Sequence, residues 1–91
     1  MPGSVEISEL IERRPDLHGG RPILAGTGVS VQRVAGWYKQ GLAPEEIAAN
    51  FGHVSLAQVH AALAYYHANR DEIEGYLAAE ELEARQLEGR H

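Results

Sequence analysis

The stretch that decides the fold is residues 43–58, APEEIAANFGHVSLAQ. Pro44 suits the first position of an α-helix, and Gly52 allows the left-handed backbone with which many helices end. Ser55 and Gln58 are spaced as a capping box, so a second helix is predicted to begin after Ser55. Two helices joined by a short turn in this way predict a helix-turn-helix.

Helical patterns flank this stretch on both sides. Ser30 can cap a helix, Gly41 can end one, and the apolar residues between them recur at helical intervals. A second capping-box pattern predicts that a further helix starts near Arg70, with one continuous helix through that point as the competing interpretation. We therefore expect a trihelical helix-turn-helix over residues 30–68 and a C-terminal helix or arm over residues 70–88.

The segment before the helices is expected to be extended. Residues 5–29 contain short apolar runs between proline and glycine turn signals, which predicts two or three short strands or extended pieces. One is predicted within residues 5–10 and another within residues 22–25. The fold class is thus mainly α: a trihelical helix-turn-helix core, preceded by a small β element and followed by a C-terminal helix. The alternative for the core is a three-helix bundle that does not contact DNA. We expect residues 1–91 to form a single domain.

Composition narrows the classes of function. Eight Lys and Arg against 13 Asp and Glu give a net charge of −5, which excludes a uniformly basic nucleic-acid-binding protein. Seven of the acidic residues lie within residues 69–91, so the helices before them are nearly neutral. The net charge therefore does not exclude weak DNA binding by those helices. The chain has no Cys, and no apolar run of the roughly 18 residues that a membrane span needs. Since the first six residues also lack the pattern of a signal peptide, we expect a cytoplasmic protein with no membrane contact.

The candidates for nucleic-acid contact are Arg21, Arg33, Ser55 and Gln58. Gln58 can pair with adenine, but its second interpretation is the reciprocal half of the capping box. The helix that would enter DNA is expected to expose Ala61 and Ala62, and it has no Arg or Lys before Arg70. Because phosphate contacts normally supply most of the affinity, we expect DNA binding to be weak for one chain and to require a dimer.

Small residues form a stripe along the same helix. Ala57, Ala61, Ala64 and Ala68 recur at intervals of four, three and four residues, which places them on one face. The stripe predicts close helix contact, either with the C-terminal helix or with a second subunit. The alternative is that alanine is present only as the best helix former.

Patterns of catalytic or metal-binding residues are not found in the sequence. His60 and His67 lie about 10.5 Å apart along a helix, which is too far for one metal ion, and His53 precedes them by another seven residues. The sequence also lacks the phosphate-loop, nucleophile-elbow and zinc-protease motifs. We expect a protein without metal, cofactor or enzymatic activity.

Four motifs, in this order, carry a family resemblance. They are GGRPILAGT at residues 19–27, VSV at 29–31, GLAPEEI at 41–47 and VHAALAYY at 59–66. Over residues 5–77 the chain resembles the domain of unknown function 433 family. The resemblance implies a three-helix, homeodomain-like helix-turn-helix core with a small β element before it. It also implies the antitoxin of a type II toxin–antitoxin pair, which represses its own operator DNA and neutralises a neighbouring PIN-like ribonuclease toxin.

In such an antitoxin, the C-terminal segment over residues 70–88 would bind the toxin encoded by the adjacent gene and would fold fully only on it. Its apolar residues would make the contact: Ile73, Tyr76, Leu77, Leu82 and Leu87. Its acidic character would complement a basic partner surface. The alternative for this segment is an ordinary last helix packed on the domain. The alternative for the whole chain is a small protein-interaction module that binds no DNA.

Overall fold

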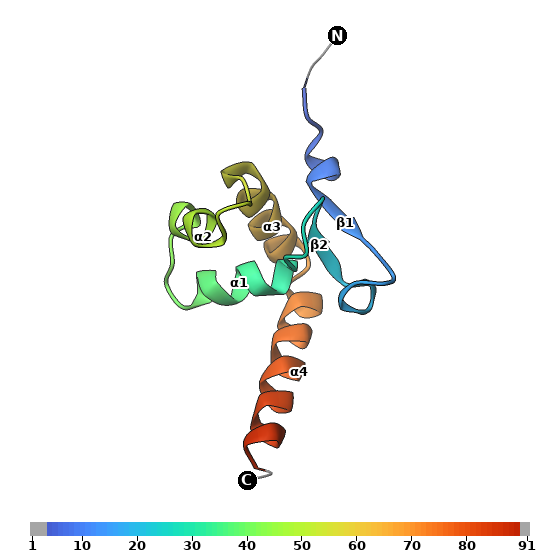
Figure 1. Ribbon diagram of the computed structural model, residues 1–91, viewed down its shortest axis with the longest axis vertical. Coiled ribbons are helices and arrows are strands. Elements are labelled where there is room, and N and C mark those ends of the chain that lie inside the picture. Colours follow the sequence, from blue (N-terminus) through green and yellow to red (C-terminus); the bar gives the residue numbers. More distant parts are fainter. Residues whose placement is uncertain (1–3, 90–91) are drawn as a thin grey trace.

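The structure is a computed structural model that describes residues 4–89 (Figure 1). The expectation that the chain has no signal peptide rests partly on residues 1–3, which lie outside this range. Two 3-10 helices (η), two strands and four α-helices make up the described part, in the order η1 (Ile7–Leu10), β1 (Ile11–Arg13), η2 (His18–Gly20), β2 (Pro22–Leu24), α1 (Val31–Lys39), α2 (Pro44–Phe51), α3 (Leu56–Ala68) and α4 (Arg70–Glu88). None of the helices within residues 4–89 is both long and apolar enough to cross a bilayer.

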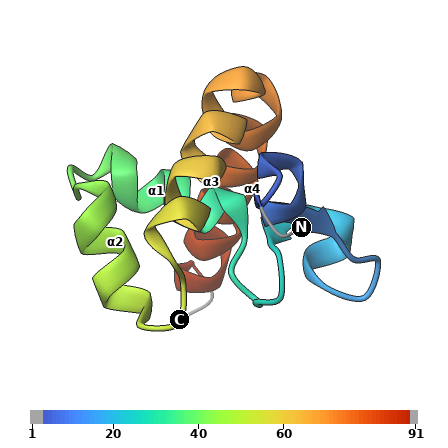
Figure 2. The same cartoon turned by 90° about the horizontal axis from the view of Figure 1, so that it is seen from above.

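The predicted helix-turn-helix is formed by α2 and α3. Pro44 is the first residue of α2, and Gly52 ends that helix with a left-handed φ of 78°. At the start of α3, the Ser55 hydroxyl accepts a hydrogen bond from the Gln58 N–H, and Gln58 Oε1 accepts one from the Ser55 N–H, each at 3.0 Å. With α1 these helices make the homeodomain-like core, and Figure 2 shows α2 and the strands on opposite sides of α3.

The β element is a two-stranded antiparallel hairpin of β1 and β2. The strand predicted within residues 22–25 is confirmed by β2. The strand predicted within residues 5–10 is wrong, because that segment contains the 3-10 helix η1. Two hydrogen bonds between neighbouring residues form the turn of η1: the Glu9 N–H donates to the Glu6 carbonyl at 2.9 Å, and the Glu6 N–H donates to Glu9 Oε1 at 3.3 Å.

The hydrophobic core lies where α1, α2, α3, β2 and the first half of α4 meet. Its largest fully buried apolar side chains are Ile23, Leu24, Val31, Val34, Ile47, Val59, Tyr66 and Ile73. The chain changes direction at Asn69 (φ −135°, ψ 50°), so α3 and α4 are separate helices and the interpretation as one continuous helix is wrong. The first half of α4 packs against α1, and its second half projects beyond the other helices (Figure 1).

Ala43→Ser is expected to raise the free energy of unfolding by about 1 kcal/mol. Ala43 occupies the N-cap position of α2 in an extended conformation (φ −72°, ψ 154°), but it has no side-chain oxygen for the free N–H groups of the first turn. The matched control is Ser55→Ala, which removes such a cap from α3 and should lower the free energy by about the same amount. Urea unfolding followed by helical circular dichroism measures both changes, and a loss of stability in Ala43→Ser would contradict the prediction.

Candidate partner-binding surfaces

Arg21 and Arg33, two of the residues predicted to contact nucleic acid, both lie near Glu80 of α4. The guanidinium carbon of Arg21 is 4.4 Å from the centre of the Tyr76 ring, and its Nη1 is 3.7 Å from Glu80 Oε2. Arg33 is exposed on α1, with its guanidinium carbon 5.6 Å from the centre of the Trp37 ring, and it lines a cavity of about 280 Å³ together with Glu80. Arg21 therefore holds α4, whereas Arg33 faces solvent.

The other two predicted contacts, Ser55 and Gln58, form the capping box of α3. Gln58 Nε2 also donates to the Ala25 carbonyl at 2.9 Å, which joins α3 to the turn after β2. Both ends of the Gln58 amide are thus bound within the fold, and this favours the capping interpretation over base reading. The expectation that α3 exposes Ala61 and Ala62 is wrong, since they are 6% and 0% exposed where α3 packs against η1, the hairpin and the core.

A polar network around Glu72 attaches α4 to the hairpin and to α3. Arg13 Nη2 donates to Glu72 Oε2 at 2.8 Å, and the hydroxyls of Tyr65 and Tyr76 donate to the same carboxylate at 2.8 and 2.7 Å. Burial alone raises the pKa of Glu72, but the hydrogen bonds from Arg13, Tyr76 and Tyr65 outweigh it and hold the pKa below its ordinary value. Sequence reasoning missed this network, because no local pattern connects Arg13 with a carboxylate 59 residues away.

Two further carboxylates of α4 bind α1. Lys39 Nζ donates to Glu74 Oε1 at 2.7 Å, and this hydrogen bond lowers the pKa of Glu74 and raises that of Lys39. The buried Gln32 side chain donates through Nε2 to Glu80 Oε2 at 3.0 Å. Carboxylates of α4 therefore bind three basic side chains of the preceding segments: Arg13, Arg21 and Lys39.

The first half of α4 belongs to the folded body. Ile73 is fully buried, and Tyr76 and Leu77 are half-buried against the core. Gly36 of α1 leaves room for this contact, since a Cβ there would lie 3.4 Å from Leu77 Cδ2. The prediction that Ile73, Tyr76 and Leu77 bind a partner is therefore corrected: the domain itself occupies them, as the alternative of an ordinary packed helix requires.

The second half of α4 is exposed. We use the name arm for this half alone, residues 81–88, which is the last part of the predicted C-terminal segment over residues 70–88. Every side chain in the arm is exposed, and Leu82 and Leu87 are 55% and 63% exposed. Eight helical residues give the arm a length of about 12 Å. The two leucines are five positions apart, so their side chains point about 140° apart around the helix. They are the predicted partner-binding residues that the domain leaves uncovered.

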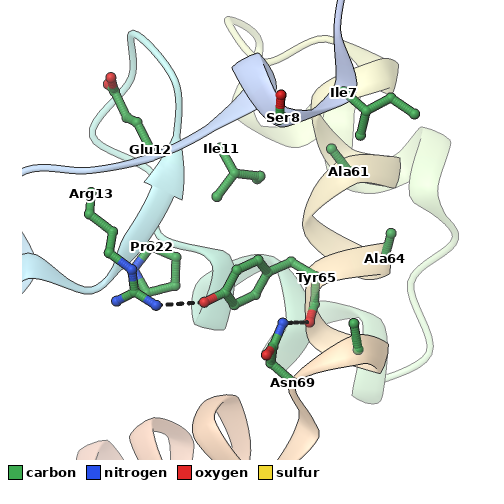
Figure 3. A pocket seen from close by; sticks show the side chains of 11 residues that line it. Ile7, Ser8, Ile11, Glu12, Arg13, Pro22, Ala61, Ala64, Tyr65 and Asn69 are labelled. Carbon is green, nitrogen blue, oxygen red and sulfur yellow. Dashed lines mark hydrogen bonds between the residues drawn. The ribbon is translucent and has the colours of Figure 1, made fainter.

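An open apolar groove runs along α3 beside η1 and β1 (Figure 3). It consists of a part of about 660 Å³ and an adjoining part of about 370 Å³, which share Ile7, Ala61 and Ala64. Figure 3 shows Ile11 pointing toward α3 from the hairpin, with Ile7 above it. All four alanines of the predicted stripe line the groove: Ala57, Ala61, Ala64 and Ala68. Because α4 turns away at Asn69, the alternative in which the stripe packs against the C-terminal helix is wrong.

The three histidines at intervals of seven lie on the surface. His53, His60 and His67 are each exposed, and the His67 ring contacts Tyr38 edge-on with ring centres 5.7 Å apart. In the part of the chain that the structure describes, no three His, Cys, Asp or Glu side chains are grouped so that they could hold a metal ion.

Helices α1–α3, the hairpin and the projecting α4 define a small homeodomain-like helix-turn-helix protein with an exposed arm and an apolar groove. The model of the family described as "Protein of unknown function (DUF433)" matches residues 11–66, and the chain belongs to this family. The resemblance carried by the sequence motifs is thereby confirmed. The matched segment begins at β1 and ends within α3, so α4 lies beyond it.

One solved structure is similar over most of its length. It is the crystal structure of a DUF433 member protein from Anabaena variabilis ATCC 29413, which is 25% identical and superposes with a TM-score of 0.72. The similarity covers 79% of this chain and 71% of that one. No curated protein matches the chain. These comparisons establish the fold and a family whose function is unknown.

Proposed function

We propose that the chain is a binding protein of the antitoxin kind, which captures a partner protein with its arm. The observation that supports this proposal is the arm itself, a helix that is exposed on all sides and presents Leu82 and Leu87 to solvent. Ordering such a helix costs conformational entropy, and no packing within the domain offsets that cost. A partner that buries the two leucines would supply the missing stabilisation. The proposed role is binding and not catalysis.

The arm determines what kind of surface can bind it. Since Leu82 and Leu87 point about 140° apart, a flat partner surface can cover only one of them, whereas a channel or clasp that surrounds the helix covers both. The arm carries three glutamates and one arginine, so basic groups at the rim of the channel would complement its charge. The partner that we propose is the one implied by the family resemblance, a PIN-like ribonuclease toxin encoded by the adjacent gene.

DNA binding is the second candidate function, because α2 and α3 form a helix-turn-helix and Arg33 is exposed on α1. Phosphate contacts normally supply most of the affinity for DNA. The contacts of Arg13, Arg21 and Lys39 with α4 leave little positive charge for that purpose. A partner-binding module without DNA binding is therefore the form of the proposal that we favour. A gel shift with the DNA upstream of the gene, at stated salt and with and without the partner, distinguishes the two forms.

Co-purification with the product of the adjacent reading frame tests the role of the arm. The wild-type chain is expected to form a stable complex. Leu82→Ala/Leu87→Ala is expected to weaken it about 30- to 1,000-fold, since burial of each leucine contributes on the order of 1–2 kcal/mol. The matched control is Leu56→Ala, which truncates a 42% exposed leucine on α3 and should leave the complex unchanged. A complex that survives the loss of both arm leucines would contradict the proposal.

A further inference from the structure

The groove along α3 has an open side at its centre. Ala64 lines both parts of the groove and is exposed, and Ile7 beside it is 72% exposed. Contiguous apolar surface of this kind on a soluble domain marks a contact with another molecule. We propose that a second copy of this chain covers the groove, so that α3 of one copy packs against α3 of the other.

The lack of charged side chains on the exposed side of α3 favours a second copy as the molecule that covers the groove. From Ile47 to Asn69 the sequence contains no Asp, Glu, Lys or Arg, so the exposed side of α3 presents only uncharged alanines and a leucine, with histidines beside them. A charged partner surface would lose hydration here without gaining an ion pair. Because each copy carries a net charge of −5, two copies repel one another unless they meet through neutral surfaces. The exposed side of α3 supplies an uncharged surface on both copies, while Glu12 and Arg13 line the groove on its hairpin side.

The stripe also has the symmetry that a two-fold contact requires. Its intervals of four, three and four residues are the same in both directions along the helix. Two antiparallel α3 helices would therefore place Ala57 opposite Ala68 of the second copy and the two exposed Ala64 side chains close to the two-fold axis, with the 6% exposed Ala61 beside them. Small side chains allow the helix axes to approach closely, and the antiparallel arrangement brings opposite ends of the helix dipoles together. The same surface then serves both copies, as in other closed two-fold dimers.

Sedimentation of the full chain tests this dimer with a charge placed near its two-fold axis. The wild-type chain is expected to sediment as a dimer at micromolar concentration. Ala64→Arg and Ala64→Glu are each expected to weaken self-association about 30-fold or more, because like charges then meet within the contact. An equal mixture of the two variants should form a heterodimer, since arginine then meets glutamate. Ala64 suits the test better than Ala61, because its side chain is exposed and its replacement leaves the core intact.

Any of three results with the wild-type chain and the Ala64 variants would overturn the proposal: a wild-type chain that stays monomeric, a dimer that survives both single variants, or a mixture that fails to associate. The matched control is Leu82→Ala/Leu87→Ala, which should sediment as the wild-type chain does. A dimer lost in that variant would also overturn the proposal, because the arm of a second copy would then be the occupant of the groove. The dimer and the partner-binding role of the arm fail independently, since Ala64→Arg leaves the arm unchanged.

Discussion

Ile73→Ala is expected to lower the free energy of unfolding by about 2–5 kcal/mol. Ile73 is fully buried and joins the first half of α4 to the core, so its truncation removes apolar contacts and leaves a cavity. A chain of 91 residues has a total stability of only about 5–14 kcal/mol, and the variant is therefore expected to unfold at much lower urea concentration. Urea titration followed by circular dichroism measures the change.

The matched control for Ile73→Ala lies on the same helix. Leu87→Ala truncates an aliphatic side chain that is 63% exposed, and it should change the free energy of unfolding by no more than about 0.5 kcal/mol. The contrast between the two variants distinguishes the docked half of α4 from the arm. Equal losses would mean that the arm also packs against the domain, and this would contradict the structure.

Glu72→Ala is expected to cost about 1–3 kcal/mol of stability. The variant removes the carboxylate that joins the Arg13 guanidinium to the hydroxyls of Tyr65 and Tyr76. Glu83→Ala is the matched control, because Glu83 lies on the same helix, is exposed and gains the same helix propensity on replacement. If the two variants are equally stable in urea, the network contributes nothing to the attachment of α4.

Acid should weaken the attachment of α4 through the same carboxylate. The folded protein holds the pKa of Glu72 below its ordinary value, so the stability that the ionised group contributes is complete above that ordinary value. It is lost as the pH falls through the lowered pKa of the folded state. Urea unfolding at successively lower pH should therefore show a shallower acid-side decline for Glu72→Ala than for the wild-type chain. An identical decline in both proteins would contradict this assignment.

The α-helices could be predicted because their boundaries depend on local chemistry. Pro44, Gly52 and Ser55 act on the backbone within a few residues of themselves, and each has the predicted role in the structure. The 3-10 helix η1 could not be predicted from hydrophobic alternation. Val5 and Ile7 alternate with polar residues as in a strand, but both stay exposed, and hydrogen bonds within residues 6–9 determine the conformation instead.

The candidate site could be predicted only in part, because periodicity shows which residues share a helix face but not what covers that face. Ile73 and Leu87 look equivalent in the sequence, yet one is fully buried and the other is exposed. Whether a residue of α4 is buried depends on how far α1 lies alongside α4. No local sequence pattern predicts this. Arg21 likewise could be identified as basic, whereas its stacking on Tyr76 depends on the tertiary fold.

The contact between Arg13 and Glu72 has a consequence for folding during synthesis. Its two residues are 59 positions apart, so at about 5–20 residues per second Arg13 is made roughly 3–12 s before its carboxylate partner. Closing a segment of that length costs chain entropy, which is offset only after α1–α3 have packed between the two ends. We therefore expect docking of α4 to be the step that completes the fold. A nascent chain that still lacks α4 also lacks this attachment of its hairpin.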